Sequence, residues 1–114
     1  MTVRTQLLGD DLWAVAPVGR IDAYTTPILE KALHDLIDQG RVRLVVDLSE
    51  ASYIASGGLK ALLGGMRRAR AAGGDLLLAG VGERVGEILT MSGFDRVFAI
   101  HPSLDQAAQS LREH

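Results

Sequence analysis

The chain has 114 residues, which suits one compact domain with a substantial core and is short for two domains. Hydrophobic residues make up 47% of it and charged residues 23%, as in an ordinary globular protein. The formal net charge of −2 argues against general nucleic-acid binding, because no excess of Lys and Arg is present to neutralise phosphates.

The sequence contains no cysteine, and this excludes disulfides, thiol catalysis and most structural zinc sites. Asp10 and Asp11 interrupt the first apolar stretch, so no signal peptide is expected. No run approaches the roughly 18 apolar residues needed to cross a bilayer. We therefore expect a cytoplasmic protein without membrane contact.

The first third of the chain predicts a β-hairpin followed by a helix. "VRTQLL" and "LWAVAPV" flank Gly9-Asp10-Asp11, which indicates a turn between two strands. In "AYTTPILEKALHDLIDQG", Thr25 or Thr26 can cap a helix, Pro27 suits its first turn and Gly40 ends it. The apolar stripe predicted for this helix consists of Ile28, Ala32, Leu33, Leu36 and Ile37.

The rest of the chain predicts alternating strands and helices. "VRLVVDL" is typical of a strand covered on both faces, and a helix over about residues 57–72 ends at Gly73-Gly74. Then come the strand "DLLLAG", the helix "ERVGEILTMSG" and a short strand "RVFAI", and Ser103 and Gln106 form a capping box for a last helix. The positions predicted to face the core are Leu59, Leu62, Leu63, Met66, Val85, Ile88, Leu89, Leu104, Ala107, Ala108 and Leu111.

This element order, β-β-α-β-α-β-α-β-α, predicts an α/β fold in a single domain over residues 1–114. We expect a mixed, mostly parallel sheet of about five strands with about four helices, the hairpin making the first strand antiparallel. The loops at 20–26, 52–58 and 80–84 then share one edge of the sheet, at the carboxyl ends of the strands, where such folds usually bind ligands or partners.

The loop "YIASGGL" places Ser56 where a strand precedes a helix. A nucleophile elbow requires G-x-S-x-G, but Ile54 stands in the place of the first glycine. None of His34, His101 and His114 is placed to act as a base for this serine. The sequence therefore does not support a catalytic nucleophile.

The same loop has three other interpretations. A phosphate-cradling loop needs G-x-x-x-x-G-K-[ST], and Gly58-Leu59-Lys60 has the wrong order. A tight turn with Ser56 as the helix cap is the structural interpretation. The last interpretation keeps this cap and makes the same hydroxyl an accessible regulatory site.

Further candidate sites have structural explanations. "GVGERVG", residues 80–86, spells G-x-G-x-x-x-G and indicates a glycine-rich turn rather than a dinucleotide site. The acidic residues Asp10, Asp11, Asp22 and Asp47 are not expected to share a metal, because the hairpin turn lies at the opposite edge from Asp22. The helix over about residues 57–72 has a basic face with Arg67, Arg68 and Arg70, which we expect to be solvated. Contact of this face with a partner is the less favoured alternative. We expect no enzyme, cofactor or metal site.

The order of these motifs over essentially the whole chain resembles the STAS domains of anti-sigma factor antagonists. The matching pieces are "GRIDAYTTPILEKAL", "LVVDLSEASYIASGGLKALLGGMRRARAAGGDLLLAGV" and "VGEILTMSGFDRVFAIHPSLDQA". In that family the loop after the third strand commonly reads Asp-Ser-Ser/Thr-Gly-Leu. The resemblance makes Ser56 the phosphoacceptor of a kinase that is also the anti-sigma factor, with Ala55 in place of the usual Asp and Gly57 in place of the second hydroxyl residue.

The resemblance also implies a surface and a set of partners. The partner-binding residues would be Asp22, Tyr24, Thr25, Ala55, Ser56, Gly57, Gly58 and Lys60. The unphosphorylated protein would bind an anti-sigma factor with a serine-kinase fold, regulating sigma-factor-dependent transcription in a bacterium. Phosphorylation of Ser56 would release this partner, and a PP2C-type phosphatase would reset the protein, a monomer or weak dimer. The alternative is a constitutive STAS scaffold or adaptor in a signalling or transport assembly.

Overall fold

Residues 2–113 are described by a computed structural model, in which strands and helices alternate after an initial hairpin. The strands are β1 (Thr2–Gly9), β2 (Leu12–Ile21), β3 (Arg43–Asp47), β4 (Ala51–Ile54), β5 (Asp75–Ala79) and β6 (Ile100–His101). The helices are α1 (Thr26–Asp38), α2 (Ser56–Ala71), α3 (Glu83–Ser92) and α4 (Leu104–Arg112), with a short 3-10 helix, η1, at Phe94–Arg96. The predicted α/β class and the four helices are confirmed.

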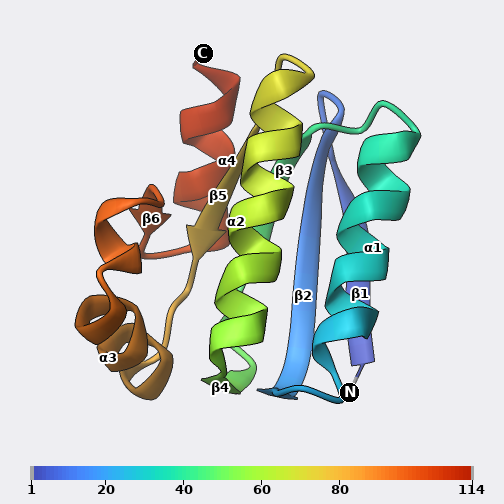
Figure 1. The fold of residues 1–114 in the computed structure, drawn as a ribbon. Coiled ribbons are helices and arrows are strands. Elements are labelled where there is room, and N and C mark those ends of the chain that lie inside the picture. Colours follow the sequence, from blue (N-terminus) through green and yellow to red (C-terminus); the bar gives the residue numbers. More distant parts are fainter. Residues whose placement is uncertain (1, 114) are drawn as a thin grey trace.

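One mixed sheet forms the centre of the molecule, with the order β1-β2-β3-β5-β6 (Figure 1). Among the strands of residues 2–113, only β1 is antiparallel to its neighbour. The hairpin turn places both Asp10 and Asp11 at positive φ, 51° and 59°, as a two-residue type I′ turn requires. β2 is long enough to pair with β3 along its first half and with β4 along its second.

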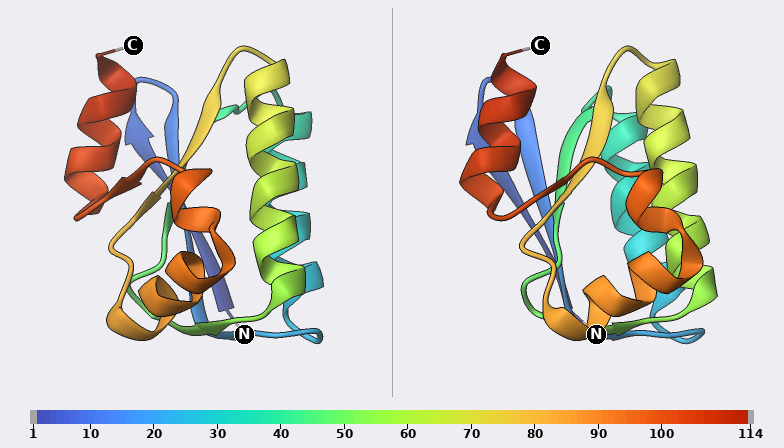
Figure 2. Two further views of the ribbon diagram at one scale, coloured as in Figure 1. Left: turned by 60° about the vertical axis from the view of Figure 1, so that its left-hand side comes forward. Right: turned by 90° about the vertical axis from the view of Figure 1, so that its left-hand side faces the viewer.

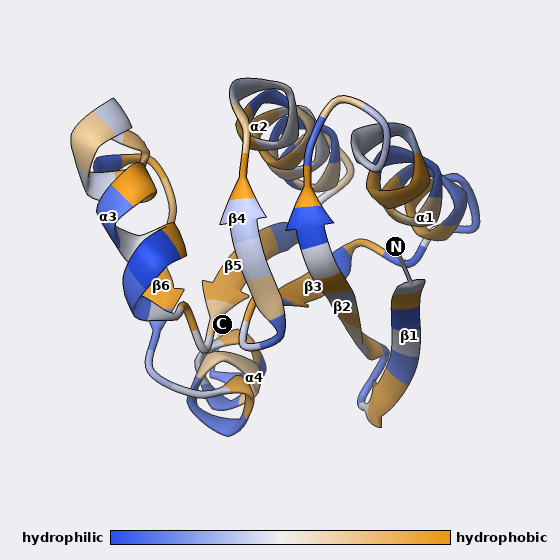
Figure 3. Ribbon diagram, turned by 90° about the horizontal axis from the view of Figure 1, so that it is seen from below, coloured by the Kyte–Doolittle hydropathy of each residue, from blue (hydrophilic) through white to orange (hydrophobic). Residues whose placement is uncertain are grey.

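Helices cover both faces of this sheet, as two turned views show (Figure 2). Helices α1 and α2 lie side by side on one face, α4 lies on the other, and α3 stands near the carboxyl ends of the strands (Figures 2 and 3). The sheet therefore has two apolar layers. One joins α1, α2 and α3 to the sheet, and a smaller one lies under α4.

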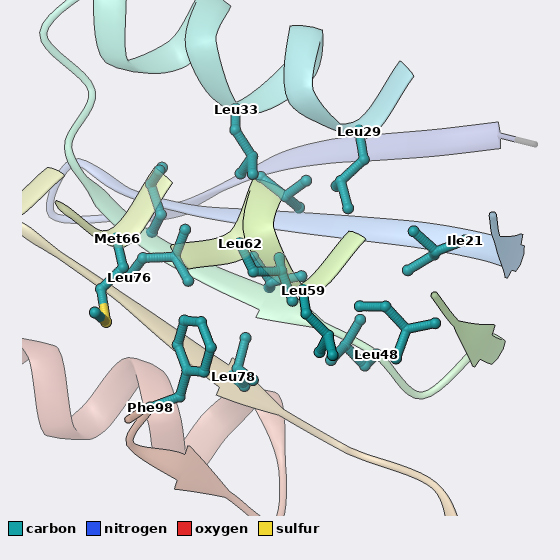
Figure 4. Packing of buried hydrophobic residues seen from close by; sticks show 14 of the residues in the cluster. Ile21, Leu29, Leu33, Leu48, Leu59, Leu62, Met66, Leu76, Leu78 and Phe98 are labelled. Atoms are coloured by element: carbon teal, nitrogen blue, oxygen red, sulfur yellow. The ribbon is translucent and has the colours of Figure 1, made fainter. Parts of the chain in front are cut away.

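The larger core contains most of the positions expected to be buried (Figure 4). Leu59, Leu62 and Met66 of α2 are each at most 4% exposed, so the predicted inner face of this helix is confirmed, with Leu63 partly buried at its margin. In α1 the predicted stripe is confirmed at Leu33, Leu36 and Ile37, which are buried, and Ala32 is partly buried, but its first member is wrong. Ile28 is 44% exposed and Leu29 is fully buried.

Two glycines end the helices of this face as predicted. After α1, Gly40 has a φ of +78°, and its N–H donates to the carbonyl of Ile37 while Arg41 N–H donates to that of Leu36. Gly73 has a φ of +90° and begins the same double hydrogen-bond pattern after α2. Both are Schellman motifs, in which glycine adopts the left-handed conformation without steric cost.

Two strand predictions were wrong. β4 was not predicted, and it adds a sixth strand beside the end of β2. "RVFAI" is not a strand along its length, because η1 ends at Arg96 and Val97 keeps a helical backbone. The buried Phe98 anchors this segment in the core, and only Ile100–His101 pairs with β5.

Candidate functional site

Two loops meet where β2 and β4 end side by side. Ile21 pairs with Ile54 in parallel register, and the N–H of Ala55 donates to the carbonyl of Ile21 at 2.8 Å. Helices α1 and α2 both begin at this edge (Figures 1 and 3). The structure therefore brings together the loops that contain Asp22 and Ser56, as the sequence predicted.

The loop after β2 is held by the carboxylate of Asp22. Its Oδ1 accepts hydrogen bonds from the N–H groups of Tyr24, at 3.0 Å, and Thr25, at 3.1 Å. Partial desolvation of Asp22 raises its pKa, but the hydrogen bonds from Thr25 and Tyr24, with the nearby charge of Arg20, bring the net pKa below the ordinary value. Asp22 is thus an ionised, fixed acceptor at neutral pH.

The two threonines before α1 also stabilise this loop. Thr25 occupies the N-cap position without a side-chain bond to the helix. Its hydroxyl instead donates to the carbonyl of Arg20 at 2.6 Å and accepts from the N–H of Asp22 at 2.9 Å. The hydroxyl of Thr26 is buried and donates to the carbonyl of Asp22 at 2.7 Å. Thr25 thus stands at the predicted N-cap position, but the predicted capping bond is wrong, because both hydroxyls bond to the loop and not to the helix.

Ser56 is the first residue of α2 and is exposed. The expectation that it caps the helix is wrong, since Ala55 is the N-cap residue and no side chain accepts a bond from the first turn. Ala55 has φ −86° and ψ 168°, so the extended chain of β4 continues through it and turns into the helix only at Ser56. The hydroxyl is consequently not occupied by helix capping.

The two glycines after Ser56 have different surroundings. Gly57 is exposed, and a Cβ there would lie 3.9 Å from the hydroxyl of Thr26. Gly58 is buried, and a Cβ there would lie 2.6 Å from Cγ2 of Ile21 and 2.8 Å from Cγ1 of Ile54. Gly58 therefore allows α2 to approach the sheet closely. It was predicted to bind the partner, but it is buried and lies beneath the predicted surface.

Known proteins resemble this chain in sequence. The STAS domain family matches residues 9–107, and the anti-sigma-B factor antagonist of Staphylococcus epidermidis is 32% identical over 84 residues, 74% of this chain and 78% of the relative. The chain belongs to the STAS domain family. The resemblance drawn from the motif order is confirmed.

Further relatives agree with this assignment. The anti-sigma-B factor antagonist of Listeria monocytogenes is 32% identical over 82 residues, 72% of each chain. The crystal structure of an anti-sigma factor antagonist from Mycobacterium paratuberculosis is 28% identical and superposes with a TM-score of 0.87, covering 97% of this chain and 93% of that chain. The STAS fold thus extends over nearly the whole sequence.

A shallow groove of about 330 Å³ borders Ser56 in this STAS domain. It lies between the start of α2, the end of β4 and the last turns of α3. Its lining residues are Tyr53, Ile54, Ala55, Ser56, Leu59, Ile88, Met91 and Ser92. The sequence had not indicated the contribution of α3. The available signal was Met91, an apolar residue out of phase with the buried face formed by Val85 and Leu89.

Exposed side chains lie on the elements that meet at this edge or border its groove. Tyr24 is 89% exposed and Met91 is 87% exposed, the two highest values for large hydrophobic side chains among residues 2–113. Lys60, one turn after Ser56 on α2, is also exposed. The carboxyl edge of this STAS domain therefore presents the small residues Ser56 and Gly57, with exposed apolar side chains on the loop after β2 and on α3.

His34 and Asp47, two residues that the sequence offered as site candidates, have contacts away from Ser56. Arg68 contacts Nδ1 of His34 and forms an ion pair with Asp38 at 2.7 Å. His101 lies on β6, and His114 falls outside the described residues. Asp47 accepts from the N–H of Ser49 at 3.0 Å, as a strand-end carboxylate often does.

Within residues 2–113 no group of three His, Cys, Asp or Glu side chains could hold a metal ion. Asp10 pairs with Arg112 at 3.2 Å, on the hairpin turn. No helix of the described part is long and apolar enough to cross a membrane. What the carboxyl edge offers chemically is an accessible hydroxyl at a helix N-terminus.

Proposed function

We propose that this STAS domain is an anti-sigma factor antagonist regulated at Ser56. Unphosphorylated, it binds an anti-sigma factor with a serine-kinase fold and frees the sigma factor; phosphorylated, it releases that partner until a PP2C-type phosphatase removes the phosphate. The relatives in Staphylococcus epidermidis and Listeria monocytogenes are named as anti-sigma-B factor antagonists. The protein acts in the cytoplasm as a monomer or weak dimer and performs no catalysis itself.

The observation that carries this proposal is the position of Ser56. It is the exposed first residue of a 16-residue helix whose first turn holds no acidic side chain. The free N–H groups and the positive end of the helix dipole favour an anion there. A phosphate on Ser56 is therefore compatible with the fold, which a reversible switch requires.

The surroundings of Ser56 support docking of a protein partner. Ala55 and Gly57 leave the backbone open to close approach, while Tyr24 and Met91 supply exposed apolar surface. Phosphorylation adds about −1.5 to −2 charges at the centre of this surface. A partner that buries the serine would then have to desolvate the charge, and this weakens the complex.

The alternative function is a constitutive STAS scaffold or adaptor in a signalling or transport assembly. The observation that favours it is Ala55, which stands where the resemblance to anti-sigma factor antagonists places an Asp. Such a protein would use the same surface without a phosphoryl switch. The two functions differ in whether a charge on Ser56 alters partner binding.

Titration of the purified anti-sigma factors of the source organism against four forms tests the proposal. Wild type and Ser56→Ala should bind one of them equally, and Ser56→Asp at least about tenfold more weakly. With ATP, mass spectrometry should find phosphate on Ser56 of the wild type, removable by a PP2C-type phosphatase. Ser52→Ala, an exposed serine on β4, is the matched control and should be phosphorylated normally. Equal affinity of all forms, with no phosphate on Ser56, would favour the adaptor.

A further inference from the structure

The surface around Ser56, to which the partner is proposed to dock, includes an apolar side chain with an oxidisable thioether. Met91 lies in the last turns of α3 and lines the same groove as Ser56. Its side chain is 87% exposed, whereas Met66 is 4% exposed and lies in the core beside Leu62 (Figure 4). The accessible thioether of α3 therefore sits at the surface assigned to the partner, and the other described thioether does not.

We propose that Met91 is an oxidation site, and that its sulfoxide weakens docking of the anti-sigma factor. The inference rests on the proposed function for its consequence. In the chemical step a hydroperoxide transfers its terminal oxygen to Sδ of Met91. The O–O bond breaks, an S–O bond forms, the thioether loses two electrons, and the hydroperoxide is reduced to the alcohol, or to water in the case of hydrogen peroxide.

The surroundings of Met91 explain why this change matters. The groove contains the apolar side chains of Leu59 and Ile88 next to Met91. A thioether suits such a surface because it is flexible, polarisable and apolar. The sulfoxide is polar and chiral, and burying it without a hydrogen-bond donor is unfavourable. Oxidation would thus act on the complex in the same direction as phosphorylation, through a different side chain.

The fold itself should tolerate the oxidation. Met91 is on the outer side of α3, while Val85 and Leu89 provide the buried side at 1% exposure each. Oxidation of Met66, in contrast, would place a polar group in the core. Selective modification of Met91 should therefore leave the melting temperature unchanged and alter only the docking surface.

Treatment with hydrogen peroxide, followed by its removal before any partner is added, tests the proposal. Site-resolved mass spectrometry should show oxidation of Met91 several times faster than that of Met66. Binding of the purified anti-sigma factor to the oxidised protein should weaken on the order of tenfold. The affinity of Met91→Leu, whatever its starting value, should be the same before and after peroxide. Met91→Gln should bind weakly without peroxide, and Met66→Leu should remain peroxide-sensitive.

Three results would overturn the inference. Met91 and Met66 could oxidise at equal rates, the protein oxidised at Met91 could bind as tightly as untreated protein, or Met91→Leu could lose affinity after peroxide as wild type does. In each of these cases, binding by untreated protein would leave the proposed function intact. If no anti-sigma factor binds untreated protein, the proposed function fails, and the regulatory consequence of Met91 oxidation fails with it.

Discussion

At the scale of single residues, Ser56 and Gly58 have different roles in one loop, the first at the surface and the second in the packing. Ser56 is exposed, whereas Gly58 lies under it against Ile21 and Ile54. The absence of a side chain at Gly58 brings the first turn of α2 down onto the ends of β2 and β4. Ser56 therefore lies on a helical turn that packs against the sheet.

Gly58→Ala should destabilise the domain. The added Cβ would approach Cγ2 of Ile21 to 2.6 Å, and such overpacking costs about 1–3 kcal/mol. Gly64→Ala in the same helix is the matched control, because a Cβ there meets nothing within 4 Å. That change should stabilise the helix by about 0.5–1 kcal/mol. Urea unfolding followed by circular dichroism measures both, and equal effects of the two substitutions would contradict the packing role of Gly58.

Asp22 should make part of the stability depend on pH. Its pKa in the folded domain lies below the ordinary value, so its contribution is fully present above the unfolded pKa of about 3.9. The contribution is lost as the pH falls through the folded value. The difference in melting temperature between wild type and Asp22→Asn should therefore be largest near neutral pH and shrink below about pH 4. A difference that grows on acidification would contradict this.

At the scale of elements, the sequence predicts best where periodicity and turn chemistry agree. The long helix α2 was expected from its apolar spacing, with Gly73 at its end, and both are confirmed. β4 was missed because four residues, Ala51–Ile54, give too short a pattern, and its pairing with β2 is a tertiary contact. The strand prediction for "RVFAI" is wrong because a short apolar run does not distinguish a strand from an anchored loop.

The sequence likewise predicts the candidate site only in part. The meeting of the Asp22 and Ser56 loops was predictable, because parallel strands place their carboxyl ends at one edge. The burial of Gly58 and the participation of α3 were not predictable, since both depend on how closely helices pack on the sheet. Local sequence does not encode these distances. Whether the predicted residues contact a partner stays a prediction.

The first half of β5, along which β6 does not pair, provides another test at this scale. β6 pairs only with its last two residues, Leu78 and Ala79, and the outward N–H of Leu76 instead donates to Oδ1 of Asp75 at 2.8 Å. The same carboxylate pairs with Arg70 at 2.9 Å. Asp75 thus accepts the hydrogen bond from an N–H group that a strand of another chain could otherwise pair with. Charged side chains at sheet edges commonly protect them in this way.

Asp75→Ala should promote self-association through this edge. A cavity of about 610 Å³, lined in part by Asp75, Leu77 and Ala99, lies beside it, so an added strand would have room. Sedimentation velocity over a range of concentrations measures the effect. Asp75→Asn retains an acceptor oxygen and should behave as wild type. Identical sedimentation of Asp75→Ala and wild type would contradict the protective role.

At the scale of the whole molecule, the two ends of the sheet are stabilised by different means. Far from Ser56, Arg43 donates to the carbonyls of Asp10, at 2.6 Å, and Leu111, at 2.9 Å. Arg112 donates to the carbonyl of Leu8 at 3.0 Å. These bonds attach α4 to the hairpin and β3. The carboxyl edge combines the apolar packing of Ile21, Ile54 and Leu59 in the larger core with the short-range hydrogen bonds of the Asp22 loop.

This separation predicts that a charge on Ser56 changes binding without unfolding the domain. Ser56 makes no capping bond, and an acidic side chain at a helix N-terminus is favourable by about 0.3–1 kcal/mol. Ser56→Asp and Ser56→Ala should therefore each melt close to wild type in scanning calorimetry. Amide hydrogen exchange should change only around the Asp22 loop and the first turn of α2. Loss of the cooperative transition in Ser56→Asp would instead show that Ser56 is mainly structural.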